Sequence, residues 1–191
     1  MKTPLLIAIK LFLLLSILTG VVYPLLIAVI GQVFFPLQAN GSLIYHNNQV
    51  AGSSLIGQQF DSTRYFWSRP SATGYNTFSS GSSNLGPGSK KLVELVKNRE
   101  INFRKLNKLP DSIPVPSEMV FASGSGLDPH ISVESALLQV NRIALSRDFN
   151  ISQKNLLISH IKKITKNPQF HIFGQARVNV LLLNLELDKI K

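Results

Sequence analysis

The apolar positions of this chain form one continuous run near the N-terminus and periodic patterns over the rest. The continuous run spans Leu11 to Phe35 and contains no charged residue. Because a helix of about 20 apolar residues crosses the hydrocarbon core of a bilayer, the run predicts a transmembrane helix over residues 11–35. A cleaved secretory signal is the alternative interpretation, but its apolar core is usually only ~7–15 residues long.

Charge on either side of this run predicts its orientation. Lys2 and Lys10 precede the run, and no charged residue occurs between Leu11 and Phe60. Positively charged residues next to a membrane span favour the cytoplasmic side. We therefore expect residues 1–10 to form a cytoplasmic tail and residues 37–191 to form a domain outside the cytoplasmic membrane.

Three residues within the run are candidates for contact with another membrane helix. Gly20, Tyr23 and Pro24 follow i, i+3, i+4 spacing and so share one helix face. Glycine allows close approach of a second backbone, and proline removes a helix hydrogen bond and can kink the helix. We expect this face to pack against a partner helix. An ordinary anchor that tolerates glycine and proline is the alternative.

The remainder of the chain predicts a single mixed α/β domain, so the expected fold class is a membrane-anchored α+β protein. Two short β segments flank Asn47-Asn48, a pair suited to a tight hairpin turn. Helical periodicity and capping residues predict four helices, over 90–107 after Ser89, 133–147 after Ser132, 153–165 after Ser152 and 180–190 after Asn179. The apolar residues expected to face the core include Leu92, Leu95, Val96, Ile101, Ala136, Leu137, Val140, Ile143, Ala144, Leu182, Leu183, Leu187 and Ile190.

Two loop segments, 64–87 and 122–130, are rich in Gly, Ser and Asn yet carry aromatic and charged side chains. Such adaptable loops with aromatic and arginine anchors are typical of docking surfaces. The interface candidates are Tyr65, Trp67, Arg69, Asn84 and Asp128. Two alternatives remain: these loops fill the domain core, or Arg69 and Asp128 pair with each other.

Composition restricts the chemistry of the domain. The formal net charge is +10, of which Lys2 and Lys10 contribute two, so the outer domain carries an excess of eight positive charges. Such an excess can favour nucleic acid, anionic headgroups or an acidic partner, but no basic-aromatic repeat supports nucleic acid and we expect none as a partner. A solvated basic surface is the simplest explanation, including the basic face of the predicted 90–107 helix, with a binding patch on that face as the alternative. The chain has no cysteine, which excludes disulfides and thiolate chemistry, and its four histidines lack the spacing of a metal site.

Catalysis has one weak candidate, the loop that contains Ser123, Ser125, Asp128 and His130. Its Ser-Gly-Ser-Gly sequence has serine where the G-x-S-x-G nucleophile pattern requires its first glycine. We therefore expect no catalytic, cofactor-binding or metal-binding residue. A membrane-anchored hydrolase that uses Ser125 or His130, and a free-standing interaction protein, are the alternatives.

Six motifs together resemble the C subunit of the Kdp potassium-transporting P-type ATPase, and they occur in the order of that family. They are TGVVYP at 19–24, GSSLIGQQF at 52–60, YFWSRPSA at 65–72, SGSSNLGP at 80–87, ASGSGLDPHIS at 122–132 and RVNVLLLNLELD at 177–188. The departures are small: Ser82 replaces a frequent glycine, and Phe121 stands where valine-threonine often precedes the alanine.

The resemblance implies a non-catalytic accessory subunit of a potassium import complex in the bacterial inner membrane. Its partners would be a channel-like potassium-selecting subunit, a P-type pump subunit that hydrolyses ATP, and a small single-span subunit. ATP and potassium would be handled by the complex. The roles proposed for the family are assembly, capping of the potassium entrance, and raising the ATP affinity of the pump. Because the predicted orientation separates this domain from cytoplasmic ATP, we expect assembly and capping, with any effect on ATP turnover being indirect.

Overall fold

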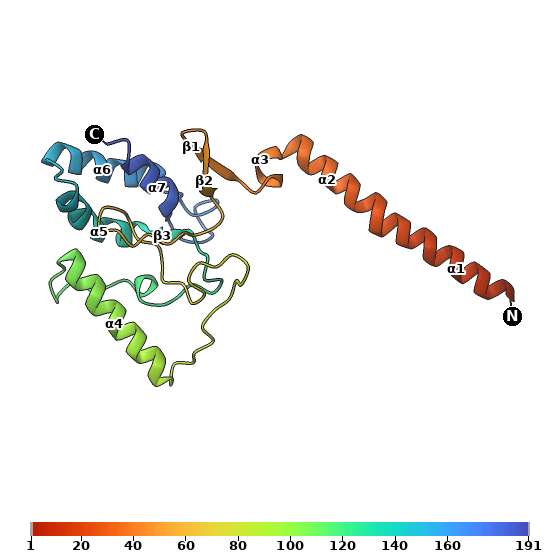
Figure 1. Ribbon diagram of the computed structural model, residues 1–191, viewed down its shortest axis with the longest axis horizontal. Coiled ribbons are helices and arrows are strands. Elements are labelled where there is room, and N and C mark those ends of the chain that lie inside the picture. The colour runs from red at the N-terminus through yellow and green to blue at the C-terminus, as the bar shows by residue number, and fades with distance from the viewer. Residues whose placement is uncertain (1, 191) are drawn as a thin grey trace. The chain divides into compact units, whose positions relative to one another are not determined.

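The computed structural model describes residues 2–190, and its contacts divide the chain into two compact units on either side of the Ile44–Tyr45 junction (Figure 1). The first unit is almost wholly helical, and the second is a mixed α/β domain. A mixed α/β chain with one N-terminal helix apolar enough to span a membrane was predicted, and both features are confirmed.

A continuous helical segment forms the first unit. It comprises α1 (Lys2–Ile17), a π-helical turn η1 (Leu18–Val22) and α2 (Tyr23–Phe34), followed by the short α3 (Pro36–Ala39). Residues 3–34 are long and apolar enough to cross a bilayer. The helix thus begins before Leu11. Residues 11–35 remain the part that we expect to lie in the membrane.

The π turn explains how the helix accommodates its proline. Pro24 has no backbone N–H, and its ring would crowd the carbonyl of Gly20, four residues earlier. The helix widens just before this point, so that the N–H of Tyr23 donates to the carbonyl of Leu18 across five residues. The disturbance expected at Pro24 therefore takes the form of a π bulge, a feature frequently found at functional sites.

The β hairpin has the predicted position. Strand β1 (Leu43–His46) pairs with β2 (Gln49–Ser53), and the turn residues Asn47 and Asn48 have φ values of 50° and 61°. Asparagine tolerates this left-handed conformation better than most residues, and it is favoured in two-residue hairpin turns.

Four helices of the second unit have nearly the predicted bounds. They are α4 (Lys90–Asn107), α5 (Val133–Ser146), α6 (Ile151–Ile164) and α7 (Val180–Leu187), together with a 3₁₀ turn η2 (Ser117–Met119). The side chains of Ser89, Ser132 and Asn179 accept the expected N-cap hydrogen bonds. The prediction of Ser152 as a cap is wrong, because Asn150 forms a reciprocal capping box with Gln153.

The core lies where α6 packs against α5 and α7, and where these helices meet the short antiparallel pair of β3 (His130–Ser132) and β4 (Arg177–Asn179). Its members include Phe66, Phe103, Ile131, Val140, Ile143, Leu157, Ile161, Val178, Leu183 and Leu187. Two inward predictions are wrong: Ile101 is 54% exposed and Leu137 is 40% exposed. On α4 the buried residues are Phe103 and Asn107 instead.

Candidate functional site

Within residues 2–190, nothing packs on the candidate face of the N-terminal apolar helix. A Cβ added at Gly20 would have no atom within 4 Å outside its immediate chain neighbours, and Tyr23 is 62% exposed. One polar group on this segment is satisfied internally, because the hydroxyl of Thr19 donates to the carbonyl of Leu15 at 2.7 Å. Gly20, Tyr23 and Pro24 are thus available for a partner helix.

Tyr65 and Trp67 flank Phe66, which is fully buried in the core. The Asn184 side chain accepts from the N–H of Phe66 at 2.8 Å and donates to its carbonyl at 3.0 Å. The Gln139 side chain forms the same pair of hydrogen bonds with the backbone of Trp67, accepting from its N–H at 2.8 Å and donating to its carbonyl at 3.4 Å. The two side-chain amides replace a neighbouring strand and fix this part of the loop to α5 and α7.

Arg142 is the centre of this arrangement and was not recognised from the sequence. The residue is only 5% exposed, and its guanidinium donates to the carbonyls of Thr63 (2.5 Å) and Tyr65 (3.0 Å), and to Asn107 Oδ1 and Gln139 Oε1. It also lies 3.8 Å from the ring centroid of Trp67. Burial lowers the pKa of Arg142 to about 10, so it remains a cation at neutral pH.

The side chain of Tyr65 is held by a similar set of cation–π and hydrogen-bond contacts, which lie closer to solvent than those of Trp67. The Arg147 guanidinium lies 4.8 Å from its ring centroid, and Asp188 accepts a hydrogen bond from its hydroxyl at 3.1 Å. Arg147 also pairs with Asp188 at 2.7 Å. Both aromatic interface candidates are therefore engaged within the domain, and they position the loop that follows them.

Arg69 and Asp128 form an ion pair, Nη1 to Oδ2, at 2.9 Å, as the alternative interpretation expected. Both side chains are partly accessible, at 26% and 31% exposed. Burial by itself raises the pKa of Asp128, but hydrogen bonds from the His130 side chain and backbone and from Arg69, together with the Arg69 charge, hold it below its usual value. The pair connects the two polar loops and stays within reach of solvent.

Asn84 lies on an exposed part of its loop, next to a groove along α4. Its left-handed backbone (φ 52°) is one that asparagine tolerates, and its Oδ1 accepts from the Ser82 hydroxyl at 2.6 Å. Past Leu85, Leu92 and Phe121 the groove continues into an apolar pocket of about 560 Å³. We call the residues that line this second part the α4 groove: Leu85, Pro87, Leu92, Val93, Val96, Lys97, Glu100 and Phe121.

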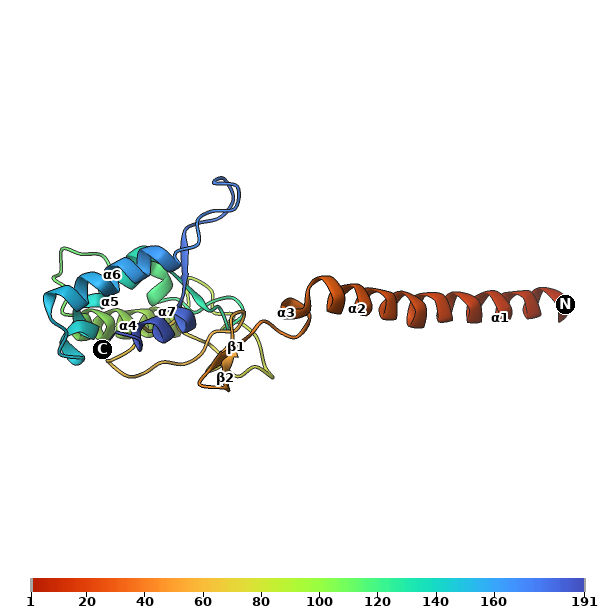
Figure 2. The same ribbon diagram turned by 90° about the horizontal axis from the view of Figure 1, so that it is seen from above.

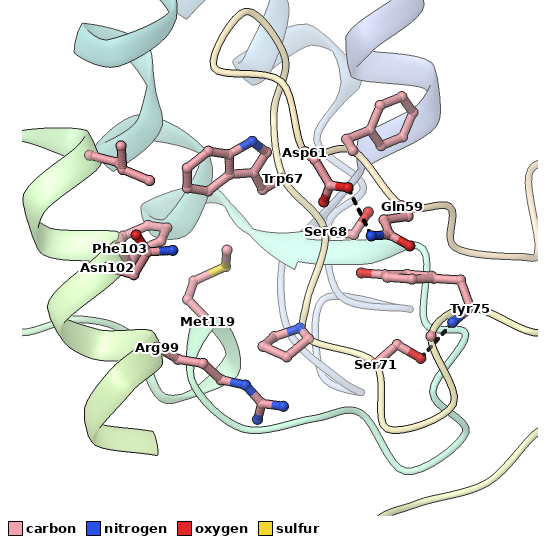
Figure 3. A pocket seen from close by; sticks show the side chains of 14 residues that line it. Gln59, Asp61, Trp67, Ser68, Ser71, Tyr75, Arg99, Asn102, Phe103 and Met119 are labelled. Atoms are coloured by element: carbon pink, nitrogen blue, oxygen red, sulfur yellow. Dashed lines mark hydrogen bonds between the residues drawn. The ribbon is translucent and has the colours of Figure 1, made fainter. Parts of the chain in front are cut away.

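A second cleft, of about 450 Å³, lies between α4 and the 59–75 loop (Figure 3). Trp67, Tyr75 and Met119 line it, and its two charged side chains are Asp61 and Arg99. Burial raises the pKa of Tyr75 to about 12, and its hydroxyl donates to the carbonyl of Arg69. Arg99 donates to the carbonyl of Val120 at 2.9 Å. These polar groups are committed to holding the fold.

The serine and histidine considered for catalysis, Ser125 and His130, do not line a common pocket in the part of the chain that the structure describes. A pocket of about 270 Å³ surrounds His130, and the serine that lines it is Ser132, whose hydroxyl caps α5. Ser125 accepts from the N–H of Leu127 at 3.1 Å and is not among the lining residues of that pocket. Within residues 2–190, no group of three or more His, Cys, Asp and Glu side chains is placed to hold a metal ion.

Comparison with known proteins identifies the family. The family described as "KdpC: K+-transporting ATPase, c chain" matches residues 5–189. A relative from Dechloromonas aromatica named potassium-transporting ATPase KdpC subunit is 47% identical, with 100% of this chain and 99% of the relative covered. Relatives of the same name from Herpetosiphon aurantiacus and Mycobacterium tuberculosis are 48% and 44% identical, over 92% and 100% of this chain and 91% and 100% of their own lengths.

The match extends through both units of the chain, from the N-terminal helix to α7, and it confirms the resemblance carried by the six motifs. The chain therefore belongs to the KdpC family of subunits of the potassium-transporting ATPase.

Proposed function

We propose that this chain is a non-catalytic accessory subunit that assembles the potassium import complex and caps its outer entrance. The observation that carries the proposal is the family match over residues 5–189 of a chain with one helix apolar enough to span a membrane. The partners are the potassium-selecting, ATP-hydrolysing and small single-span subunits of the bacterial inner-membrane complex. ATP turnover is influenced through coupled conformations, since the domain lies outside.

The outer contact with the potassium-selecting subunit uses the polar loops and the α4 groove beside them. Asn84 and the partly exposed Arg69–Asp128 pair supply polar contacts, and Tyr65 and Trp67 hold the loop in place from beneath. The α4 groove supplies apolar surface, with Val93 60% exposed and Phe121 43% exposed. Interfaces commonly combine an apolar centre with a polar rim of this kind.

A substitution in the α4 groove tests this contact. Val93→Asp places a charge in the apolar surface, and we expect it to lower the amount of the large subunits that co-purify with the tagged chain. Ile101→Asp is the matched control, because Ile101 is on the same helix, is 54% exposed and does not line the groove. Equal recovery of the complex with both variants would exclude the groove from the interface.

Topology is tested separately. With Lys2 and Lys10 inside and no charge from Leu11 to Phe60, protease added to spheroplasts should cleave the domain. Cleavage only in inverted vesicles would reverse the orientation and make direct contact with ATP the better hypothesis.

Ser125→Ala and His130→Ala separate the accessory role from the hydrolase alternative, since loss of all activity in an intact complex would favour an enzyme.

A further inference from the structure

Residues 166–177, which we call the arm, form a narrow two-stranded projection between α6 and β4 (Figure 2). At its base, Lys166 and Arg177 exchange backbone hydrogen bonds of 2.9 and 3.0 Å. Near its tip, Gln169 and Phe173 exchange two more, of 2.8 and 2.9 Å. The arm is therefore an ordered hairpin-like element, held by its own backbone pairing, that stands away from the helices of the domain.

The tip of the arm presents apolar side chains to solvent. Phe170 is 77% exposed, Ile172 is 76% exposed and Phe173 is 65% exposed, and all three lie within four consecutive residues. Scattered single apolar residues are normal on a protein surface, but a contiguous exposed group indicates a binding surface. The three side chains add nothing to the domain core, whose members lie elsewhere.

The backbone conformation at the tip indicates that Phe170 is not a residue type that this turn would favour. Phe170 and His171 have φ values of 53° and 60°, nearly the same pair as Asn47 and Asn48 in the β1–β2 hairpin. Asparagine suits that conformation, whereas a bulky phenylalanine adopts it at a cost. Unfavourable backbone conformations of this kind cluster at functional sites.

Basic residues lie at the base of the arm and at the end of the helix that leads into it. No Asp or Glu occurs between residues 149 and 185, whereas this stretch contains Lys154, Lys162, Lys163, Lys166 and Arg177. The last four are exposed, at the end of α6 and at the base of the arm. The acids nearest to these basic residues come from other segments: Glu118 and Asp128 line a pocket with Arg177, and Glu186 lies near Lys163. The tip and its own segment therefore combine exposed apolar side chains with basic residues, which complements a surface of anionic lipid headgroups.

Chain length keeps the domain near the bilayer. Tyr45, the first residue of the second unit, lies only eleven positions after Phe34, the end of the apolar helix. Even fully extended, this linker spans no more than about 40 Å. A domain on so short a tether meets the lipid surface continually, so weak insertion of the arm would suffice to hold it in one orientation.

We propose that the tip of the arm inserts into the headgroup region of an anionic lipid leaflet as a second membrane contact, which rests on the proposed anchoring by the N-terminal helix. Phe170, Ile172 and Phe173 enter the boundary between headgroups and acyl chains. The exposed lysines and Arg177 bind the lipid phosphates. Together with the helix, the arm fixes how the outer domain faces its partner subunits.

The absence of cysteine allows a single label to test this inference in the full chain. An Ile172→Cys variant carrying an environment-sensitive fluorophore is reconstituted into phosphatidylcholine vesicles with or without phosphatidylglycerol. Nitroxide-labelled lipids act as the quencher. The matched control is Phe78→Cys, since Phe78 is a fully exposed phenylalanine on a different loop. We expect quenching at position 172 roughly two-fold or more above position 78, only with the anionic lipid, and reduced by Lys162→Glu with Lys163→Glu.

Each other result counts against the inference. Vesicle flotation reports the helix anchor: a chain that does not float overturns both the anchoring and the arm, whereas a floating chain with an unquenched label overturns the arm alone. Equal quenching at positions 172 and 78 shows non-specific contact and also overturns it. A label that lipid leaves unquenched, but that becomes shielded from iodide when the other subunits are added, identifies a protein partner instead.

Discussion

Replacing Arg142 by methionine tests whether this buried cation holds the loop to the helices. The substitution keeps an unbranched side chain of similar length but removes every donor. It leaves the carbonyls of Thr63 and Tyr65 and the Oδ1 of Asn107 without this partner. Trp67 also loses the guanidinium that lies over its ring.

The expected magnitude follows from two opposing effects. Four hydrogen bonds from a charged donor contribute at least about 6 kcal/mol at ~1.5 kcal/mol each. Against this, removing the buried charge recovers about 3 kcal/mol, which corresponds to the lowering of the Arg142 pKa from 12.5 to about 10. We therefore expect the free energy of unfolding to fall by about 3–5 kcal/mol, in the range found when a buried charged network is broken.

The assay uses Trp67, which is the sole tryptophan of the chain and reports directly on this contact. Fluorescence of the full chain in detergent should show a melting midpoint lower by roughly 6–20 °C. Arg64→Met is the control: Arg64 is exposed, and its guanidinium donates a single long hydrogen bond of 3.4 Å, to the carbonyl of Ser146. An Arg142→Met variant that melts like the control would refute the assigned role.

Three further substitutions test other parts of the structure. Asp128→Asn should make the free energy of unfolding depend less on pH in the acid range. The pKa of Asp128 in the folded state lies below its ordinary value of 3.8, so the ionised carboxylate stabilises the fold above pH 3.8 and this stabilisation is lost as the pH falls through the folded-state pKa. A variant whose melting midpoint falls with acid as steeply as that of the unmodified chain would contradict this. Gly57→Ala should cost about 1–3 kcal/mol of unfolding free energy, because the new methyl carbon would lie 2.7 Å from the carbonyl oxygen of Asp128, whereas Gly81→Ala meets no atom within 4 Å and should melt normally. Gly20→Leu should reduce co-purification of the partner subunits more than Val29→Phe, which adds bulk on the opposite face of the same helix, and equal recovery would indicate a lipid-facing position.

Local features of the sequence were sufficient to predict most helices and the hairpin. The apolar run 11–35, the Asn47-Asn48 turn and the caps Ser89, Ser132 and Asn179 all act through residues only a few positions away. The hydrogen bonds and steric limits that define them are therefore visible in a short window. The six motifs identified the family for a different reason, since they preserve particular residues in a fixed order.

The tertiary structure decided the roles of the candidate residues. Tyr65 and Trp67 have the composition of docking anchors, but they are engaged by Arg142 and Arg147 from α5 and its C-terminus. The contact of Phe66 with Asn184 joins positions 118 residues apart, and no local pattern indicates that an amide side chain will replace a strand there.

The same limit applies to the surface. The arm was not predicted, because its tip resembles an ordinary apolar segment until the fold leaves it without a core to enter. Residue type and short-range spacing set the local conformations, and burial is a property of the assembled chain. The sequence thus determined the elements and the family, whereas only the packing of distant segments decided which aromatic, arginine and apolar side chains lie inside and which remain exposed for a partner or a membrane.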